Sequence, residues 1–138
     1  MLEEAGVGFC NIDQPRIGRS IGPSKKSTGR VGYVRLHGRN YQDWFRRDAG
    51  RDARYDYLYS EKELDPWFEK IEQISEDSQE TYVITNNHFR GKAVVNALQI
   101  KSRILGDKVE VPETMINSYP ELENFACQSE TPRQAKLF

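Results

Sequence analysis

The chain has 138 residues, of which 30% are charged, and its formal net charge is -1. This length predicts one domain with a modest core, and the near-neutral charge argues against a surface built for general nucleic-acid binding. The sequence pI is about 6.1 and the mean hydropathy is -0.77, which is typical of a water-soluble protein.

The charge is unevenly distributed along the chain. The segment 14–42 holds seven basic residues and no acid, whereas residues 61–80 hold eight acids against Lys62 and Lys70. The simpler interpretation of this division is two solvated faces of opposite charge.

Neither cysteines nor apolar runs indicate a special compartment. Cys10 and Cys127 lie far apart without a CxxC spacing, which predicts neither a disulfide framework nor a zinc site. No signal peptide is expected from the acidic start, and no window approaches the roughly 20 apolar residues of a spanning helix. We therefore expect a cytoplasmic protein.

The first half of the chain predicts two strands separated by a loop. Residues 7–13 form the first expected strand, preceded by the last turn of a helix that Gly6 caps. Residues 17–30 are rich in Gly, Ser, Lys and Pro, so a flexible loop is expected there. The second strand is expected over 31–37, and residues 39–59 form a long, partly structured excursion.

The second half predicts two helices around a third strand. Asp65-Pro66 indicates a helix start, and Leu64, Trp67, Phe68, Ile71 and Ile74 keep an apolar stripe at helical spacing. The third strand is expected over 81–85 and the second helix over 92–105.

In the second helix, Val94, Ala97, Leu98 and Leu105 are expected to share the apolar face. The polar remainder, 106–138, is expected to be irregular or to hold one short helix. Strands that alternate with helices predict an α/β fold with parallel strands.

All three predicted strands end in polar residues. Side chains alternate across a strand, and on that basis Asp13, Arg35, His37, Asn86 and His88 are placed on one face at the carboxyl ends. Ligands bind at this edge in α/β proteins, so the cluster is a candidate site. The alternative is a buried ion-pair network in which Asp13 and Arg35 are partners.

The candidate cluster is poor in carboxylates, which argues against a metal. No cofactor can be named from it. His37 and His88 are the candidates for proton transfer, with Asp13 orienting or pairing with them.

The segment 86–92 suggests anion binding. Arg90 and Lys92 lie at a helix start, where the helix dipole disfavours cations, and Gly91 allows the backbone to approach a ligand. An anion such as phosphate would reconcile the two, with Arg35 contributing and Asn86 and Asn87 at the mouth of the site. The alternative is that Arg90 and Lys92 extend into water.

Two further features have competing interpretations. The aromatic residues Trp44, Tyr55, Tyr57 and Tyr59 could form a stacking surface, although ordinary packing of a long loop is the simpler explanation. The chain ends in Gln134-Ala-Lys-Leu137-Phe138, which resembles the short peptide by which bacterial DNA-processing proteins dock on the sliding clamp. Ala135 departs from the usual leucine of that motif.

Three segments together carry a family resemblance: residues 33–39 (YVRLHGR), 55–60 (YDYLYS) and 86–99 (NNHFRGKAVVNALQ). They resemble the Domain of Unknown Function family 72, also called the YecE-like family. Asp13 followed by Pro15 matches a further landmark, while Gln14 and Thr85 depart from the usual residues.

The resemblance spans roughly residues 2–120 and implies the last three βα units of a TIM-barrel-like fold, followed by a polar tail over 121–138. It gives candidate positions and no reaction. The missing strands could come from another chain. The first expected function is thus to bind an anionic or phosphorylated ligand at the barrel mouth. The non-catalytic alternative is docking on the sliding clamp. The third possibility is a degraded reading frame without function.

Overall fold

The computed structural model describes residues 2–48, 50 and 52–127. Its centre is a parallel sheet in the order β1-β2-β3, made of Cys10–Asp13, Val31–Leu36 and Glu80–Thr85. The helix α1 (Glu61–Glu76) joins β2 to β3, and α2 (Lys92–Leu105) follows β3. The predicted α/β class, with parallel strands alternating with helices, is confirmed.

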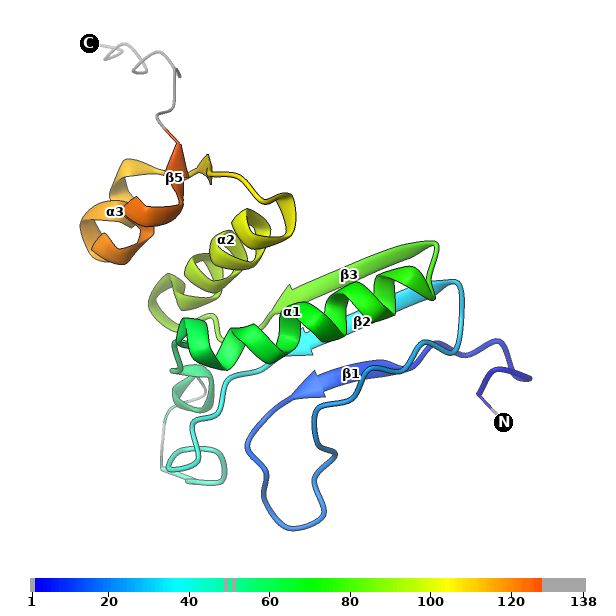
Figure 1. Cartoon of the computed structure of the whole chain (residues 1–138). Helices are drawn as coiled ribbons and strands as arrows, with labels where there is room; N and C mark the ends of the chain where they lie inside the picture. Colours follow the sequence, from blue (N-terminus) through cyan, green and yellow to red (C-terminus); the bar gives the residue numbers. More distant parts are fainter. Residues whose placement is uncertain (1, 49, 51, 128–138) are drawn as a thin grey trace, which may run out of the picture.

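The connection from β1 to β2 contains no helix. Residues 14–30 hold no helix or strand, in agreement with the loop predicted over 17–30, and Figure 1 shows them as a long loop after β1. The buried Asn11 side chain anchors this loop: its Oδ1 accepts from the Lys26 N–H at 2.8 Å, and its Nδ2 donates to the Lys26 carbonyl at 2.8 Å. Before β1, Gly6 has the left-handed φ of +64° expected of a cap, but residues 2–6 form a turn rather than a helix.

The helix α1 covers one face of the sheet (Figure 1). Its apolar stripe is buried as predicted, and it packs with Val34 and Leu36 of β2 around Tyr59. Gly32 permits this close packing, since a Cβ there would lie 2.4 Å from Cγ2 of Ile74.

The predicted start of α1 was wrong. The helix begins at Glu61 after Ser60, whose N–H donates to the Glu63 carboxylate at 3.0 Å in a capping box. Pro66 therefore lies inside the helix, where its missing N–H leaves the carbonyl of the exposed Lys62 without that bond.

The bounds of α2 were predicted correctly, but its buried face was not. Val95, Asn96, Gln99 and Ile100 are buried, while Val94 and Leu105 are 47% and 62% exposed. A rule that places polar residues outside fails here because Asn96 and Gln99 are buried among hydrogen-bond partners.

The C-terminal region forms a second, smaller core. It contains β4 (Val109–Glu110), α3 (Glu113–Ser118), the 3-10 helix η3 (Pro120–Phe125) and β5 (Ala126–Cys127), with β4 and β5 pairing in parallel. Val95, Val109, Val111 and Leu122 form its buried centre. The single short helix expected after residue 106 is α3, whereas the strand pair was not predicted. Within the described residues, none of the helices combines the length and apolar character that a membrane crossing requires.

Candidate functional site

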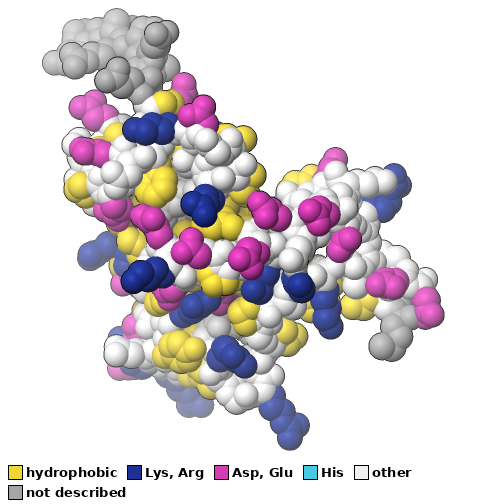
Figure 2. Space-filling model, viewed as in Figure 1, with side chains coloured by type: hydrophobic (Ala, Val, Ile, Leu, Met, Phe, Trp, Pro, Cys, Tyr) yellow, Lys and Arg dark blue, Asp and Glu magenta, His cyan; other side chains and the backbone are white. Residues whose placement is uncertain are grey.

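The site lies where β2 and β3 end. The last residues in register are Leu36 of β2 and Thr85 of β3. One more hydrogen bond, from the Asn86 N–H to the Leu36 carbonyl at 2.6 Å, extends the pairing beyond them. His37 and Asn86 therefore leave the sheet side by side. Neither histidine is visible on the face that carries α1 (Figure 2), where acidic and basic side chains are mixed.

Three side chains form a hydrogen-bonded chain at this edge. Arg35 donates from Nη2 to Oδ1 of Asn86 at 3.1 Å, and the Asn86 Nδ2 lies 3.3 Å from Nδ1 of His37. The Arg35 Nε is buried and has no hydrogen-bond partner among the described residues. This arrangement leaves one directed N–H unsatisfied beside a histidine.

Aromatic rings from the excursion cover the same place. The short 3-10 helix η1 (Ala53–Tyr55) brings the Tyr55 ring to 4.8 Å from the His88 ring and 6.2 Å from the His37 ring, measured between centroids. Trp44 packs edge-on against Tyr55 at 6.4 Å. The aromatic residues predicted for this segment thus divide: Trp44 and Tyr55 lie at the site, whereas Tyr59 is buried in the main core.

Burial and charge act together on His37. Burial lowers its pKa below the ordinary value of 6.5, the Arg35 charge lowers it further, and the Asp13 carboxylate opposes both less strongly. His37 is therefore neutral at pH 7 and has a ring nitrogen able to accept a proton.

Acids of the excursion contact two of the predicted site residues, His88 and Lys92. Asp52 lies 3.3 Å from Nε2 of His88, and Asp56 pairs with the Lys92 ammonium. Among the described residues no carboxylate pairs with Arg35, so its charge at this edge is not compensated in the same way.

Arg90 and Gly91 form a tight corner between β3 and α2, in which the backbone of Arg90 is strained and that of Gly91 is not. Both have positive φ, 54° and 80°, and the Tyr119 hydroxyl donates to the Arg90 carbonyl at 2.7 Å. The Arg90 guanidinium is exposed and lies over the Phe89 ring, 5.3 Å from its centroid. Anion binding by Arg90 and Gly91 therefore stays a prediction.

Asp13 does not share the face of Arg35, which corrects the predicted alignment. The register pairs Asp13 with Leu36 and Ile12 with Arg35, so Asp13 points toward α1. It is 1% exposed and accepts from Nη2 of Arg39 at 2.7 Å and from Nε1 of Trp67 at 2.7 Å. The predicted Asp13–Arg35 ion pair was wrong, because the register of β1 turns Asp13 to the opposite side.

Asn87 is also displaced from its predicted place at the mouth. It is fully buried, and its Nδ2 donates to the Tyr57 carbonyl at 2.7 Å and to Oδ1 of Asn96 at 2.8 Å. Its role in the structure is to hold the excursion against α2.

Sequence reasoning missed Asp52, Asp56 and Asn96. The two aspartates belong to a segment without periodicity, and only their tertiary contacts connect them to His88 and Lys92. Asn96 lies in the family segment 86–99, but nothing in the helical pattern distinguishes it from a surface amide.

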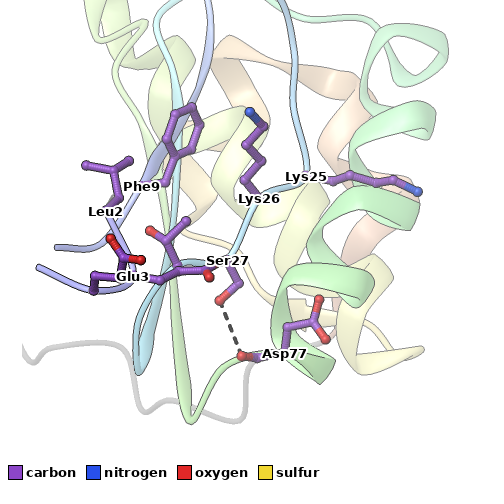
Figure 3. Close-up of a pocket in the computed structure, with 9 residues that line it drawn as sticks. Leu2, Glu3, Phe9, Lys25, Lys26, Ser27 and Asp77 are labelled. Atoms are coloured by element: carbon purple, nitrogen blue, oxygen red, sulfur yellow. Dashed lines mark hydrogen bonds between the residues drawn. The ribbon is translucent and has the colours of Figure 1, made fainter. Parts of the chain in front are cut away.

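A cavity of about 560 Å³ lies elsewhere, beyond the amino ends of the strands (Figure 3). It is lined by the N-terminal turn, Phe9, the segment 25–28 and Asp77, and Lys26 stacks on the Phe9 ring. Its mixed charges and its distance from the polar strand ends separate it from the candidate site. The proposed docking residues Gln134, Leu137 and Phe138 lie outside the described residues.

The fold and the site together define an α/β protein with a polar, partly aromatic cluster at the carboxyl ends of parallel strands. The family model described as "Protein of unknown function DUF72" matches residues 1–119, so the chain belongs to this family. It is 32% identical over 93 residues to the UPF0759 protein YunF of Bacillus subtilis, a match that covers 64% of this chain and 33% of YunF.

Two solved structures of DUF72 family proteins have a fold similar to the matched part of this chain. A DUF72 family protein from Thermotoga maritima is 40% identical with a TM-score of 0.69, and the match covers 75% of this chain and 38% of that one. A DUF72 family protein from Enterococcus faecalis is 29% identical with a TM-score of 0.66, covering 81% and 42%. The chain therefore spans less than half the length of these relatives.

Proposed function

We propose that the cluster at the ends of β2 and β3 binds a small anion, such as a phosphate or carboxylate group, with Arg35 as the anchor. The observation that carries the proposal is the buried Arg35 Nε without a hydrogen-bond partner among the described residues. A buried N–H of a charged group is costly when unsatisfied, and an anion oxygen would satisfy it.

The neighbouring groups suit the same ligand. The amide of Asn86 fixes the guanidinium, and His37 stands next to it with a lowered pKa. A bound anion would raise the pKa of His37 toward neutral pH. An imidazole transfers protons well when its pKa is close to the surrounding pH. If the complete protein is an enzyme, His37 is the first candidate for its acid or base, with His88 behind Tyr55 as the second.

Arg90, Gly91 and Lys92 remain secondary in this proposal. Lys92 already has Asp56 as a partner, and Arg90 is exposed. We expect Arg90 to add long-range attraction rather than to anchor the ligand. The TIM-barrel-like architecture implied by the resemblance belongs to the proposal as well, since it would place the cluster at a barrel mouth.

Thermal unfolding in phosphate or sulfate tests the proposal. A ligand at ten times its Kd stabilises the folded state by about 1.4 kcal/mol, which raises the melting temperature measurably. Arg35→Gln should abolish the rise. Arg30→Gln is the matched control, because Arg30 precedes the same strand and its side chain donates to the exposed Gln79, away from the candidate site. Equal rises in both variants would contradict the proposal.

A further inference from the structure

The side chain of Asn86 lies between two groups of different hydrogen-bonding character. Its Oδ1 lies 3.1 Å from Nη2 of Arg35, and its Nδ2 lies 3.3 Å from Nδ1 of His37. A guanidinium has donors and no acceptor, so the amide atom that faces it must be the oxygen. Arg35 therefore fixes the orientation of the amide and turns its NH2 group toward the imidazole.

The orientation of this amide determines where His37 carries its proton. An NH2 group only donates, so Nδ1 of His37 accepts and carries no hydrogen. Because burial and the Arg35 charge lower the pKa of the imidazole, the ring is neutral at pH 7 and its one proton lies on Nε2. Within residues 2–48, 50 and 52–127, Nε2 has no hydrogen-bond partner, so its N–H is left for a ligand.

The carboxylates near this edge have other partners. Oδ1 of Asp52 lies 3.3 Å from Nε2 of His88, and Asp56 pairs with the Lys92 ammonium. Asp13 is 1% exposed and is turned to the opposite face of the sheet. None of these three acids is therefore placed to accept a hydrogen from a ligand beside His37.

We propose that Asn86 is a positioning residue that holds His37 in the Nε2–H tautomer, and that the ligand is an oxyanion recognised through oxygens that carry no hydrogen. This assignment rests on the anion site proposed at Arg35. The two groups left for the ligand, the Arg35 Nε–H and the His37 Nε2–H, are both donors. Sulfate, sulfonate, carboxylate and phosphate groups supply acceptors for both, whereas a ligand hydroxyl finds no acceptor on either.

Nitrogen NMR of the ligand-free chain tests the tautomer. Long-range proton–nitrogen spectra separate a protonated ring nitrogen from a bare one, and they are recorded on the alkaline plateau of the histidine titration, where the rings are neutral. We expect the His37 proton on Nε2. The Nδ1–H form, or an even mixture of the two forms, overturns the proposal. This measurement needs no substitution and no ligand.

Asn86→Asp tests the positioning role. The new carboxylate accepts from Arg35 and from the imidazole alike, so the variant should move the His37 proton to Nδ1. His88 is the internal control, because its Nδ1 lies 3.2 Å from the Asn86 backbone carbonyl, which the variant retains. If Asn86→Asp does not fold, Asn86→Ala takes its place and should lower the Nε2–H fraction of His37. An unchanged His37 tautomer overturns the positioning role.

Melting temperatures in sulfate and in phosphate at about pH 8 test the ligand class. A site of two donors should bind the two anions within about threefold of each other, because neither needs to donate a hydrogen. A preference for phosphate of about tenfold or more shows an acceptor in the site and overturns the proposal. If neither anion raises the melting temperature while His37 carries its proton on Nε2, the proposed function fails and the tautomer assignment stands.

Discussion

The side chain of Asn96 bonds both backbone groups of Tyr59. Its Oδ1 accepts from the Tyr59 N–H at 3.1 Å, and its Nδ2 donates to the Tyr59 carbonyl at 3.0 Å. These are the two bonds that a neighbouring strand would supply to an extended residue. One amide of α2 thereby holds the segment between η1 and α1, which follows directly on Tyr55 and carries Asp56 at the candidate site.

We expect Asn96→Ala to lower the free energy of unfolding by about 2–4 kcal/mol. The substitution leaves the buried Tyr59 backbone groups and the Gln99 side chain without these partners. Urea unfolding followed by circular dichroism measures the change. Asn117→Ala, at an exposed position of α3, is the control and should stay close to the parent; a similar loss in both variants would refute the assigned role.

Glu63 should stabilise the fold in a pH-dependent way. Burial raises its pKa, but hydrogen bonds from Tyr57 and Ser60 and the charge of Arg39 outweigh burial, so the native pKa is lower than its usual value of 4.5. The stabilisation is therefore present above about pH 4.5 and is lost as the pH falls through the native pKa.

Glu63→Gln should accordingly melt below the parent at pH 7, with the difference shrinking as the pH falls through the native pKa of Glu63. Melting curves across this range provide the measurement. The exposed Glu69→Gln, on the same helix, is the matched control. A difference for Glu63→Gln that does not vary with pH would show that its carboxylate charge is not the cause.

The His37 imidazole should titrate below pH 6.5 in the free protein, because burial and Arg35 both disfavour its charged form. Phosphate bound at Arg35 should raise this pKa. Arg35→Gln should raise it without phosphate and remove the phosphate response. Proton NMR of the two histidines in the chain measures these shifts; a phosphate response unchanged in Arg35→Gln would exclude Arg35 as the anchor.

The clamp-docking hypothesis rests on the sequence alone and needs its own test. If Gln134, Leu137 and Phe138 dock on a bacterial sliding clamp, the complete chain should be retained on immobilised clamp. Removing residues 134–138 should abolish retention. Retention that does not depend on these five residues would eliminate the docking role.

The sequence contained enough information for the three strands of the main sheet, the two long helices and the family. The periodic stripe of Leu64, Trp67, Ile71 and Ile74 and the three segments of the family resemblance are local patterns, and both predictions were confirmed. The start of α1 failed because two valid N-terminal signals compete there, and Ser60 with Glu63 forms a complete capping box that Asp65-Pro66 does not.

The sequence by itself also placed polar residues at the ends of β2 and β3, since alternation along each strand is a local property. Only the tertiary structure decided which of them meet. The register of β1 turned Asp13 toward Arg39 and Trp67, and the fold of the excursion brought Asp52 and Tyr55 to His88 and Asp56 to Lys92. The periodicity of one strand shows which of its residues share a face, but not which residues of another strand they pair with, and a shift in register by one residue moves every side chain to the other face.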